Sequence, residues 1–371
     1  MNRIGILAMS HPALGGTFQY TLSMIDALKR IPRYKYTIYT TSENRSYDEI
    51  GLPIVHLPGA LASAFAYAGS RLLGIGSVDP FSEVDALISP IYSPRLLVTR
   101  RPFAFTLHDL QERHSPENFS ILQRLWRNAA NLALSRAAQY IICESNHVKG
   151  DIRHFLEADE AKIVVIPSPP VSSLMPLSEK DAADVIRRSN IKMPDEFIFY
   201  PAQFFKHKNH HRLIDAFARV LRDHPNCHLL LTGQPKYEYS NVMSRIAELG
   251  IQDRVIHLGY VETEIIAVAY ARAVLVVVPT LFESVSIPVY EAFRMGVPVC
   301  AANVTALPEQ IGDAGVLFDP YSVGDIAQKI DLMLKDKDLR DKLIKRGRAR
   351  IGALTSEWYA GQLAALLDRM V

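Results

Sequence analysis

The sequence has few cysteines, almost no excess of charge and no long apolar run. Its three cysteines lie far apart among 371 residues, so neither a disulfide framework nor a zinc-binding spacing fits them, and a reducing cytoplasm is expected. The 41 basic and 39 acidic residues leave a net charge of +2, which gives no indication of a nucleic-acid partner. With 49% hydrophobic and 22% charged residues, the composition excludes disorder and fits a globular chain of about two domains.

Segments that could enter a membrane are also scarce. The apolar run Ile4–Met9 is too short and poorly flanked for a signal peptide, so none is expected. No stretch of about 18 strongly apolar residues is present, so no spanning helix is expected. The nearest candidate is Leu57–Val78, in which Arg71 is the only charge. Two interpretations of it stay open: a buried or active-site loop with a short helix, or a segment that dips into the membrane surface.

The first half of the chain alternates short strand-like runs with helical stretches. This order predicts a parallel, doubly wound sheet. The proline-rich and serine-rich segment Ile166–Pro176 is typical of a linker. The predicted strands are Ile4–Met9, Tyr36–Tyr39, Ala86–Ser89, Phe103–Leu107 and Tyr140–Cys143, and the predicted helices are Tyr20–Ile31 and Leu122–Ala138.

The second half repeats the alternation, so the sequence predicts two α/β domains, residues 1–170 and 177–354, with ligands bound beyond the carboxyl ends of the strands in a cleft between them. The region Ile326–Met370 is predicted to be mostly helical. The predicted strands are Phe197–Tyr200, His228–Thr232, Val255–Leu258, Val274–Val278 and Val297–Ala301, and the predicted helices are Arg212–Leu221, Val242–Glu248 and Ile265–Arg272.

The strongest local pattern follows the strand Val274–Val278. Pro288 suits the first turn of a helix and Gly296 suits its end, which places Glu283 in the preceding loop and Glu291 one turn inside the helix. The backbone N–H groups near 284–287 are then expected to be unpaired and to form a phosphate site. Two carboxylates beside it could accept hydrogen bonds from sugar hydroxyls. The alternative is that both glutamates only favour the start of the helix.

A second pattern lies between the strand at 197–200 and the following helix. Lys208 can place an ammonium group against a phosphate, although the basic loop could also be simply solvated. The neighbouring His207, His210 and His211 are not expected to bind metal, because cations flank them and the sequence shows no carboxylate close by.

Two patterns in the first half also follow strands. His108, at the end of the strand 103–107, is expected to face the cleft, where it could donate a hydrogen bond to a sugar or carry a proton, unless it has a structural role. Gly15 and Gly16 follow the first strand and permit close approach of backbone to a ligand, or form a plain turn. They do not complete the G-x-G-x-x-G pattern, so a nicotinamide or flavin cofactor is not favoured.

Taken together, these patterns resemble the retaining GT-B glycosyltransferases with a C-terminal E-x7-E motif (the family 4 or group 1 type). The resemblance covers nearly the whole chain, and Ser356-Glu-Trp358 resembles part of that family's final helix, which would return to the N-terminal domain (about 355–371). The matching pieces are Gly15-Gly16, His108-Asp109, Glu144-Ser145, Lys208-Asn209, Gly259-Tyr260-Val261, Glu283, Pro288, Glu291-Ala292, Gly296-Val-Pro298-Val and Ala306-Leu-Pro-Glu309.

The resemblance implies two facing Rossmann-like domains, an acceptor-binding first domain and a second domain that binds a nucleotide sugar as substrate. It implies no metal and no other cofactor, and a front-face retaining mechanism. His108, Lys208 and Glu283 would be the catalytic residues. Contacts with the nucleotide sugar are implied for Gly15, Gly16, Gln203, Lys208, Gly259, Tyr260, Val261, Glu283, Ser284, Val285, Ser286, Ile287 and Glu291.

Two departures from the family pattern bear on which sugar nucleotide is the donor. Gln203 stands where relatives often have an arginine, and Ser284 and Ser286 stand where glycines are usual. The expected donor is GDP-mannose or a related sugar nucleotide, with a UDP-hexose as the alternative. The acceptor would be a saccharide or a lipid-linked saccharide, as in bacterial surface polysaccharide or lipopolysaccharide synthesis by a cytoplasmic enzyme in peripheral contact with the inner face of the plasma membrane. The competing functions are a nucleotide-sugar epimerase and an inactive nucleotide-sugar-binding protein.

Overall fold

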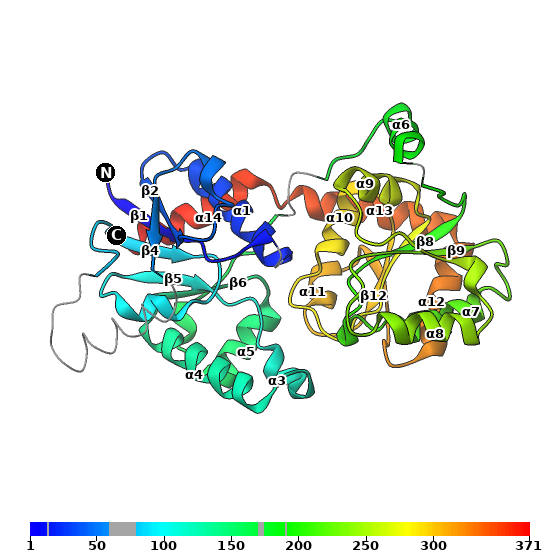
Figure 1. Cartoon of the computed structure of the whole chain (residues 1–371), viewed down its shortest axis with the longest axis horizontal. Coiled ribbons are helices and arrows are strands. Elements are labelled where there is room, and N and C mark those ends of the chain that lie inside the picture. Colours follow the sequence, from blue (N-terminus) through cyan, green and yellow to red (C-terminus); the bar gives the residue numbers. More distant parts are fainter. Residues whose placement is uncertain (13–14, 59–78, 170–173, 190) are drawn as a thin grey trace. The chain divides into compact units, whose positions relative to one another are not determined.

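The computed structural model describes residues 1–12, 15–58, 79–169, 174–189 and 191–371. The chain divides into two compact units (Figure 1). Unit 1 comprises Met1–Pro169 and Leu354–Val371, and unit 2 comprises Pro170–Ala353. The expected fold class is confirmed, because each unit holds one parallel sheet with helices packed on it.

Unit 1 is built on a seven-stranded sheet of order β3-β2-β1-β4-β5-β6-β7. Its central strands β1, β4, β5 and β6 are buried runs rich in Ile, Leu, Ala and Phe, as expected where helices cover both faces of a parallel sheet. The predicted strands were found, while β3 and β7 escaped prediction because they are short edge strands. The strands are β1 (Arg3–Leu7), β2 (Lys35–Thr41), β3 (Ile54–Leu57), β4 (Ala86–Ser89), β5 (Phe103–Thr106), β6 (Tyr140–Cys143) and β7 (Ile163–Val165).

Helices cover both faces of this sheet. One apolar cluster joins the sheet to α1 and α14, which lie side by side in Figure 1, and a second joins it to α4 and α5. The helix α14 therefore belongs to the core of unit 1 although it follows unit 2 in the sequence. The helices are α1 (Gly16–Lys29), α3 (Gln111–His114), α4 (Ile121–Ala137), α5 (Asn146–Leu156) and α14 (Ser356–Asp368), with short 3-10 turns at Asp48–Ile50, Pro94–Val98, Pro116–Asn118 and Glu160–Lys162.

Unit 2 has a six-stranded sheet of order β10-β9-β8-β11-β12-β13. The order reverses beside β8, so β8 and β11 are neighbours whose following loops leave the same edge of the sheet. The strands are β8 (Phe197–Pro201), β9 (His228–Thr232), β10 (Val255–His257), β11 (Leu275–Val278), β12 (Val299–Ala302) and β13 (Gly315–Phe318), of which β13 was not predicted.

The helices of unit 2 pack in two groups, with α7 against α8 and α12, and α10 against α9 and α13. The helices are α6 (Glu179–Ser189), α7 (His210–Val220), α8 (Tyr239–Glu248), α9 (Thr263–Arg272), α10 (Ile287–Met295), α11 (Leu307–Ile311), α12 (Val323–Lys335) and α13 (Lys337–Gly352), with 3-10 turns η6 (Lys206–Lys208) and η7 (Gln252–Arg254).

Among the described residues, no helix combines the length and apolarity that a membrane crossing needs. Of the segment Leu57–Val78, which the sequence offered as a possible membrane contact, only Leu57 and Pro58 are among the described residues.

Candidate active site

The loop between β11 and α10 has the predicted form. Helix α10 begins at Ile287, carries Pro288 in its first turn and ends at Gly296, whose φ of 71° is left-handed. Glu283 therefore lies in the loop and Glu291 lies in the second turn of the helix. The loop leaves the carboxyl end of a buried central strand, which fixes its starting point.

Lys208 and Glu283 meet directly in unit 2. Lys208 Nζ donates a hydrogen bond of 2.5 Å to Glu283 Oε1, and the two side chains are 21% and 12% exposed. The two residues are 75 positions apart, and the adjacency of β8 and β11 is what brings their loops together. The predicted phosphate-binding cation and the predicted sugar-binding carboxylate thus form one ion pair.

The position of Lys208 is set by its neighbour Asn209. Asn209 is buried and left-handed, with φ of 58°, and its side-chain amide donates to the carbonyls of Pro279 at 2.8 Å and Pro320 at 2.9 Å. The hydroxyl of Tyr200, on β8, donates to the Lys208 carbonyl at 2.8 Å. These bonds fix η6 to the loop after β11, so the backbone that carries the ammonium group is held in place.

The Glu283 backbone is held by a threonine from the loop after β12. Glu283 N–H donates to Thr305 Oγ1 at 3.1 Å, and that hydroxyl donates to the Glu283 carbonyl at 2.6 Å. Thr305 itself has φ of 48°, a costly conformation for a β-branched residue that the surrounding structure must impose.

The expected anion site at the start of α10 needs one correction. The N–H of Ser286 is not unpaired: it donates to Gln310 Oε1 at 2.8 Å, and Gln310 Nε2 returns a bond to the Ser286 carbonyl at 2.7 Å. This exchange fixes the entry to the helix, as a capping side chain would. Ser284, Val285 and Ile287 flank it, so any phosphate contact from this segment would come from their backbone rather than from Ser286 N–H.

Glu291 is held by a residue that the sequence did not single out. Tyr270, on α9, donates its hydroxyl to Glu291 Oε2 at 2.6 Å. Burial raises the pKa of Glu291, although the hydrogen bond from Tyr270 and the charge of Arg294 act to lower it. Tyr270 occupies one carboxylate oxygen and so orients the side chain.

The remaining unit 2 residues predicted to contact the nucleotide sugar also follow the carboxyl ends of strands. Gln203 follows β8, and Gly259, Tyr260 and Val261 follow β10. The Gly259 carbonyl accepts from Gly233 N–H at 2.8 Å. A Cβ on Gly233 would lie 2.5 Å from the Ala202 carbonyl oxygen, so only glycine fits there. Tyr260 is 77% exposed, which leaves its ring available to a ligand.

In unit 1, His108 lies beyond β5 with both ring nitrogens engaged. Nδ1 lies 2.9 Å from Glu144 Oε2, and Nε2 lies 3.0 Å from the Pro90 carbonyl. Burial acts to lower the pKa of His108, but the hydrogen bond and charge of Glu144 outweigh it, so the pKa is raised. Facing a carboxylate and a carbonyl, both nitrogens carry protons when His108 is charged. A hydrogen bond from the His108 ring to a sugar would therefore have to replace its bond to Glu144 or to the Pro90 carbonyl.

The predicted glycine pair opens α1 of unit 1. Gly15 is the residue before the helix, with φ of 57° and ψ of −114°, which only glycine adopts without strain. A Cβ at Gly15 would meet nothing within 4 Å, so its conformation, not crowding, requires glycine. Gly16 is the exposed first residue of the helix.

The three histidines around Lys208 do not form one group. His210 stacks on Phe204 with ring centroids 4.3 Å apart, and burial, with a contribution from Lys208, lowers its pKa to about 3. Burial and Lys208 also lower the pKa of His207 to about 4. The expectation that no carboxylate is near was wrong for His211, whose Nε2 lies 3.1 Å from Glu238 Oε2.

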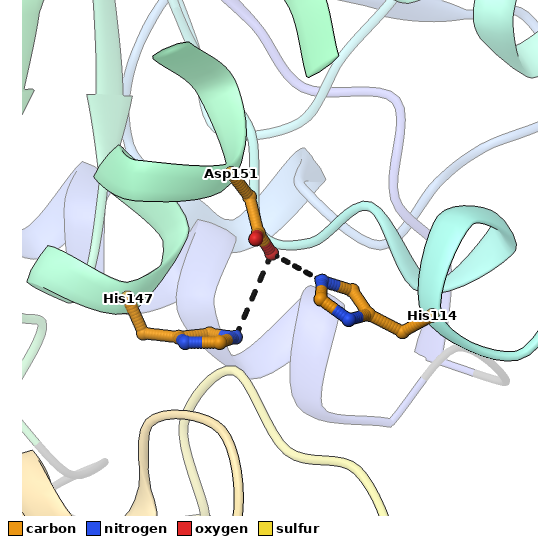
Figure 2. A group of neighbouring side chains, drawn as sticks. All are labelled: His114, His147 and Asp151. Atoms are coloured by element: carbon orange, nitrogen blue, oxygen red, sulfur yellow. Dashed lines mark hydrogen bonds and ion pairs between the residues drawn. The ribbon is translucent and has the colours of Figure 1, made fainter. Parts of the chain in front are cut away.

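Sequence reasoning missed a different histidine cluster. His114, His147 and Asp151 gather in unit 1 (Figure 2), and they are the only such potential metal-binding group among the described residues. The i, i+4 spacing of His147 and Asp151 was a signal in the sequence, but His114 lies 33 positions before His147 and only the fold brings it close.

Comparisons with known proteins identify the family and the fold. Residues 181–350 match the family "Glycosyl transferases group 1", and residues 14–169 match "Glycosyltransferase Family 4". The solved structure of Anabaena Alr3699/HepE in complex with UDP-glucose aligns with a TM-score of 0.78 and 20% identity, over 100% of both chains. The chain belongs to the GT-B glycosyltransferases of the group 1 and family 4 type.

Curated relatives resemble parts of the chain. O-antigen chain mannosyltransferase B of Escherichia coli is 29% identical over 216 residues, which cover 58% of this chain and 56% of that relative. The match thus spans little more than half of that relative's length. O-antigen chain mannosyltransferase RfbU of Salmonella typhimurium is 21% identical over 314 residues, which cover 82% of this chain and 83% of the relative.

Proposed function

We propose that the chain is a retaining glycosyltransferase that moves a hexose from a nucleotide sugar to a saccharide or lipid-linked acceptor. The observation that carries the proposal is the Lys208–Glu283 pair, held at 2.5 Å beside the start of α10 in a chain of this family. The mannosyltransferase relatives favour GDP-mannose as donor and surface-polysaccharide synthesis as the process. A UDP-hexose remains the alternative donor, since a fold neighbour is described with UDP-glucose.

In this proposal unit 2 binds the donor. Lys208 contacts the diphosphate, Glu291 accepts from the ribose hydroxyls, and Glu283 accepts from the sugar hydroxyls. The bond between the anomeric carbon and the β-phosphate oxygen breaks while the acceptor oxygen bonds to the same face of the sugar. The acceptor's proton passes to the leaving phosphate, and the Lys208 ammonium stabilises the charge that builds there. No metal is assigned to this step.

The test is a panel of nucleotide sugars with and without a lipid-linked saccharide acceptor. We expect acceptor-dependent release of a nucleoside diphosphate, most rapidly from GDP-mannose, and a product of unchanged anomeric configuration by NMR. An epimerase would instead return an altered nucleotide sugar. A protein that binds a donor but releases nothing with any acceptor would contradict the proposal.

We also propose that α4 attaches the enzyme to a membrane. Its first turns expose four large apolar side chains: Ile121 by 72%, Leu122 by 79%, Leu125 by 61% and Trp126 by 62%. The start of this helix is stabilised, because Ser120 and Gln123 form a reciprocal capping box. The helix has no acidic residue. Arg127 is paired with Asp109 and Glu112, so Arg124, beside the exposed apolar side chains, is the charge that complements an anionic lipid surface.

The membrane proposal predicts co-sedimentation with vesicles that contain anionic phospholipid, and weaker binding as salt rises. Because each buried large apolar side chain contributes about 1.5–3 kcal/mol, the double change Leu122→Ser and Trp126→Ser should weaken binding at least about 100-fold. Tyr237→Ser, at an 87% exposed aromatic in unit 2, is the matched control. Equal vesicle binding by all three proteins would exclude α4 as the contact.

A further inference from the structure

The cluster of His114, His147 and Asp151 brings two imidazoles to one carboxylate. His114 Nε2 lies 2.7 Å from Asp151 Oδ2, and His147 Nε2 lies 3.6 Å from the same oxygen. One ligand atom from each residue lies within 4.8 Å of the others. Figure 2 shows both rings directed toward the Asp151 carboxylate, one from α3 and one from α5. The three side chains thus gather around the Asp151 carboxylate.

Helix α5 supplies two of the three groups on one face. His147 and Asp151 are four residues apart, so they lie one turn apart on the same side of the helix. Ser145 caps the helix by accepting from Val148 N–H, which fixes the turn that carries His147. The Asp151 side chain is only 11% exposed, so its carboxylate is held in position and needs partners.

The chemistry of this set matches a transition metal ion better than Mg²⁺ or Ca²⁺, which prefer ligand sets made only of oxygen. Tetrahedral Zn²⁺ with bonds of about 2.0–2.2 Å places its ligand atoms about 3.4 Å apart. The observed separations of 2.7 and 3.6 Å lie on either side of that value. The ligand atoms of the two histidines lie within 4.8 Å of each other, so an ion would draw the two rings together by rotation, and three protein ligands leave a fourth position for water.

We propose that His114, His147 and Asp151 bind a divalent transition metal ion, best matched by Zn²⁺, which joins α3 to α5. The site does not depend on the proposed donor chemistry. The segment from β5 to α3 carries His108, and Glu144 lies just before α5. The ion would therefore fix together the two segments that carry the His108–Glu144 pair, as a positioning element.

The experiment is titration of chelator-treated, tag-free full-length protein with Zn²⁺ by calorimetry and with Co²⁺ by absorption. We expect one saturable site, a tetrahedral Co²⁺ spectrum without a thiolate charge-transfer band, and a rise in Tm on metal addition. The thiolate band should be absent because Cys143, Cys227 and Cys300 are all buried. His147→Ala and Asp151→Asn should each weaken metal binding more than about 100-fold, since loss of an outer-shell partner alone costs about 10–100-fold.

His154→Ala is the matched control, because His154 is an exposed histidine on the same helix. It should retain the metal site. Circular dichroism and the Tm without metal show whether each variant is folded. The wild-type Co²⁺ spectrum decides the question even if a variant fails to fold. No saturable binding by the wild type, a thiolate band, or undiminished binding by folded His147→Ala would overturn the proposal.

Discussion

Replacing Lys208 with alanine is expected to lower kcat by about 10²–10³-fold, as loss of a preorganised charge contact does in other enzymes. Negative charge builds on the β-phosphate as the glycosidic bond breaks, so a fixed ammonium acts more on the transition state than on the bound donor. The donor KM should therefore change less than kcat. Steady-state kinetics with the preferred donor and acceptor measure both.

Lys206→Ala is the matched control for this prediction. Lys206 is an exposed lysine in the same 3-10 turn, two residues away, and its loss should have little effect. Gln203→Arg should be tolerated and should tighten nucleoside diphosphate binding, because arginine adds a bidentate donor for phosphate. If Lys208→Ala turns over normally while Lys206→Ala is inactive, the phosphate has been assigned to the wrong lysine.

The two glutamates should separate nucleotide binding from turnover. Glu291→Gln is expected to weaken binding of the bare nucleoside diphosphate by about 1.5–3 kcal/mol, the value of a hydrogen bond to a charged group. That corresponds to about 10- to 150-fold in Kd. Isothermal titration calorimetry gives this value directly. The variant keeps the size of the side chain, so Tyr270 retains an acceptor for its hydroxyl.

Glu283→Gln should leave nucleoside diphosphate binding intact and lower turnover. Removing the negative charge leaves the Lys208 ammonium without its anionic partner, so affinity for the diphosphate is not expected to fall. The sugar hydroxyls, in contrast, lose a charged acceptor. Loss of diphosphate binding in Glu283→Gln, with normal binding in Glu291→Gln, would reverse the two assignments.

The fold was predictable because buried parallel strands are recognisable in sequence. The run Leu275–Val278 was predicted almost to the residue, and it is buried throughout. The edge strand β7 was missed because three residues carry no periodicity. Helix α5 was missed although its buried Val148, Ile152 and Leu156 recur at helical spacing, since Gly150 and the charged residues between them make the run look polar.

The sequence allowed prediction of which residues belong to the site, but not of which contacts they make. The spacing of Glu283 and Glu291 marked the helix and its loop, and the structure has both where expected. The partners were not predictable, because Tyr270 and Gln310 reach the site from other elements. The pairing of Lys208 with Glu283 likewise depends on which strands become neighbours, which a sequence pattern does not specify.

The packing of α14 on α1 has a consequence for how the chain folds as it is synthesised. Unit 2 lies entirely within residues 170–353 and can close its sheet as soon as it has left the ribosome. Unit 1 emerges first but finishes last, because its core includes Tyr359, Leu363, Leu366 and Leu367 from the final helix. Until those residues emerge, the apolar face of α1 has no cover, so the earliest-made part of the chain is the part that needs protection from aggregation longest.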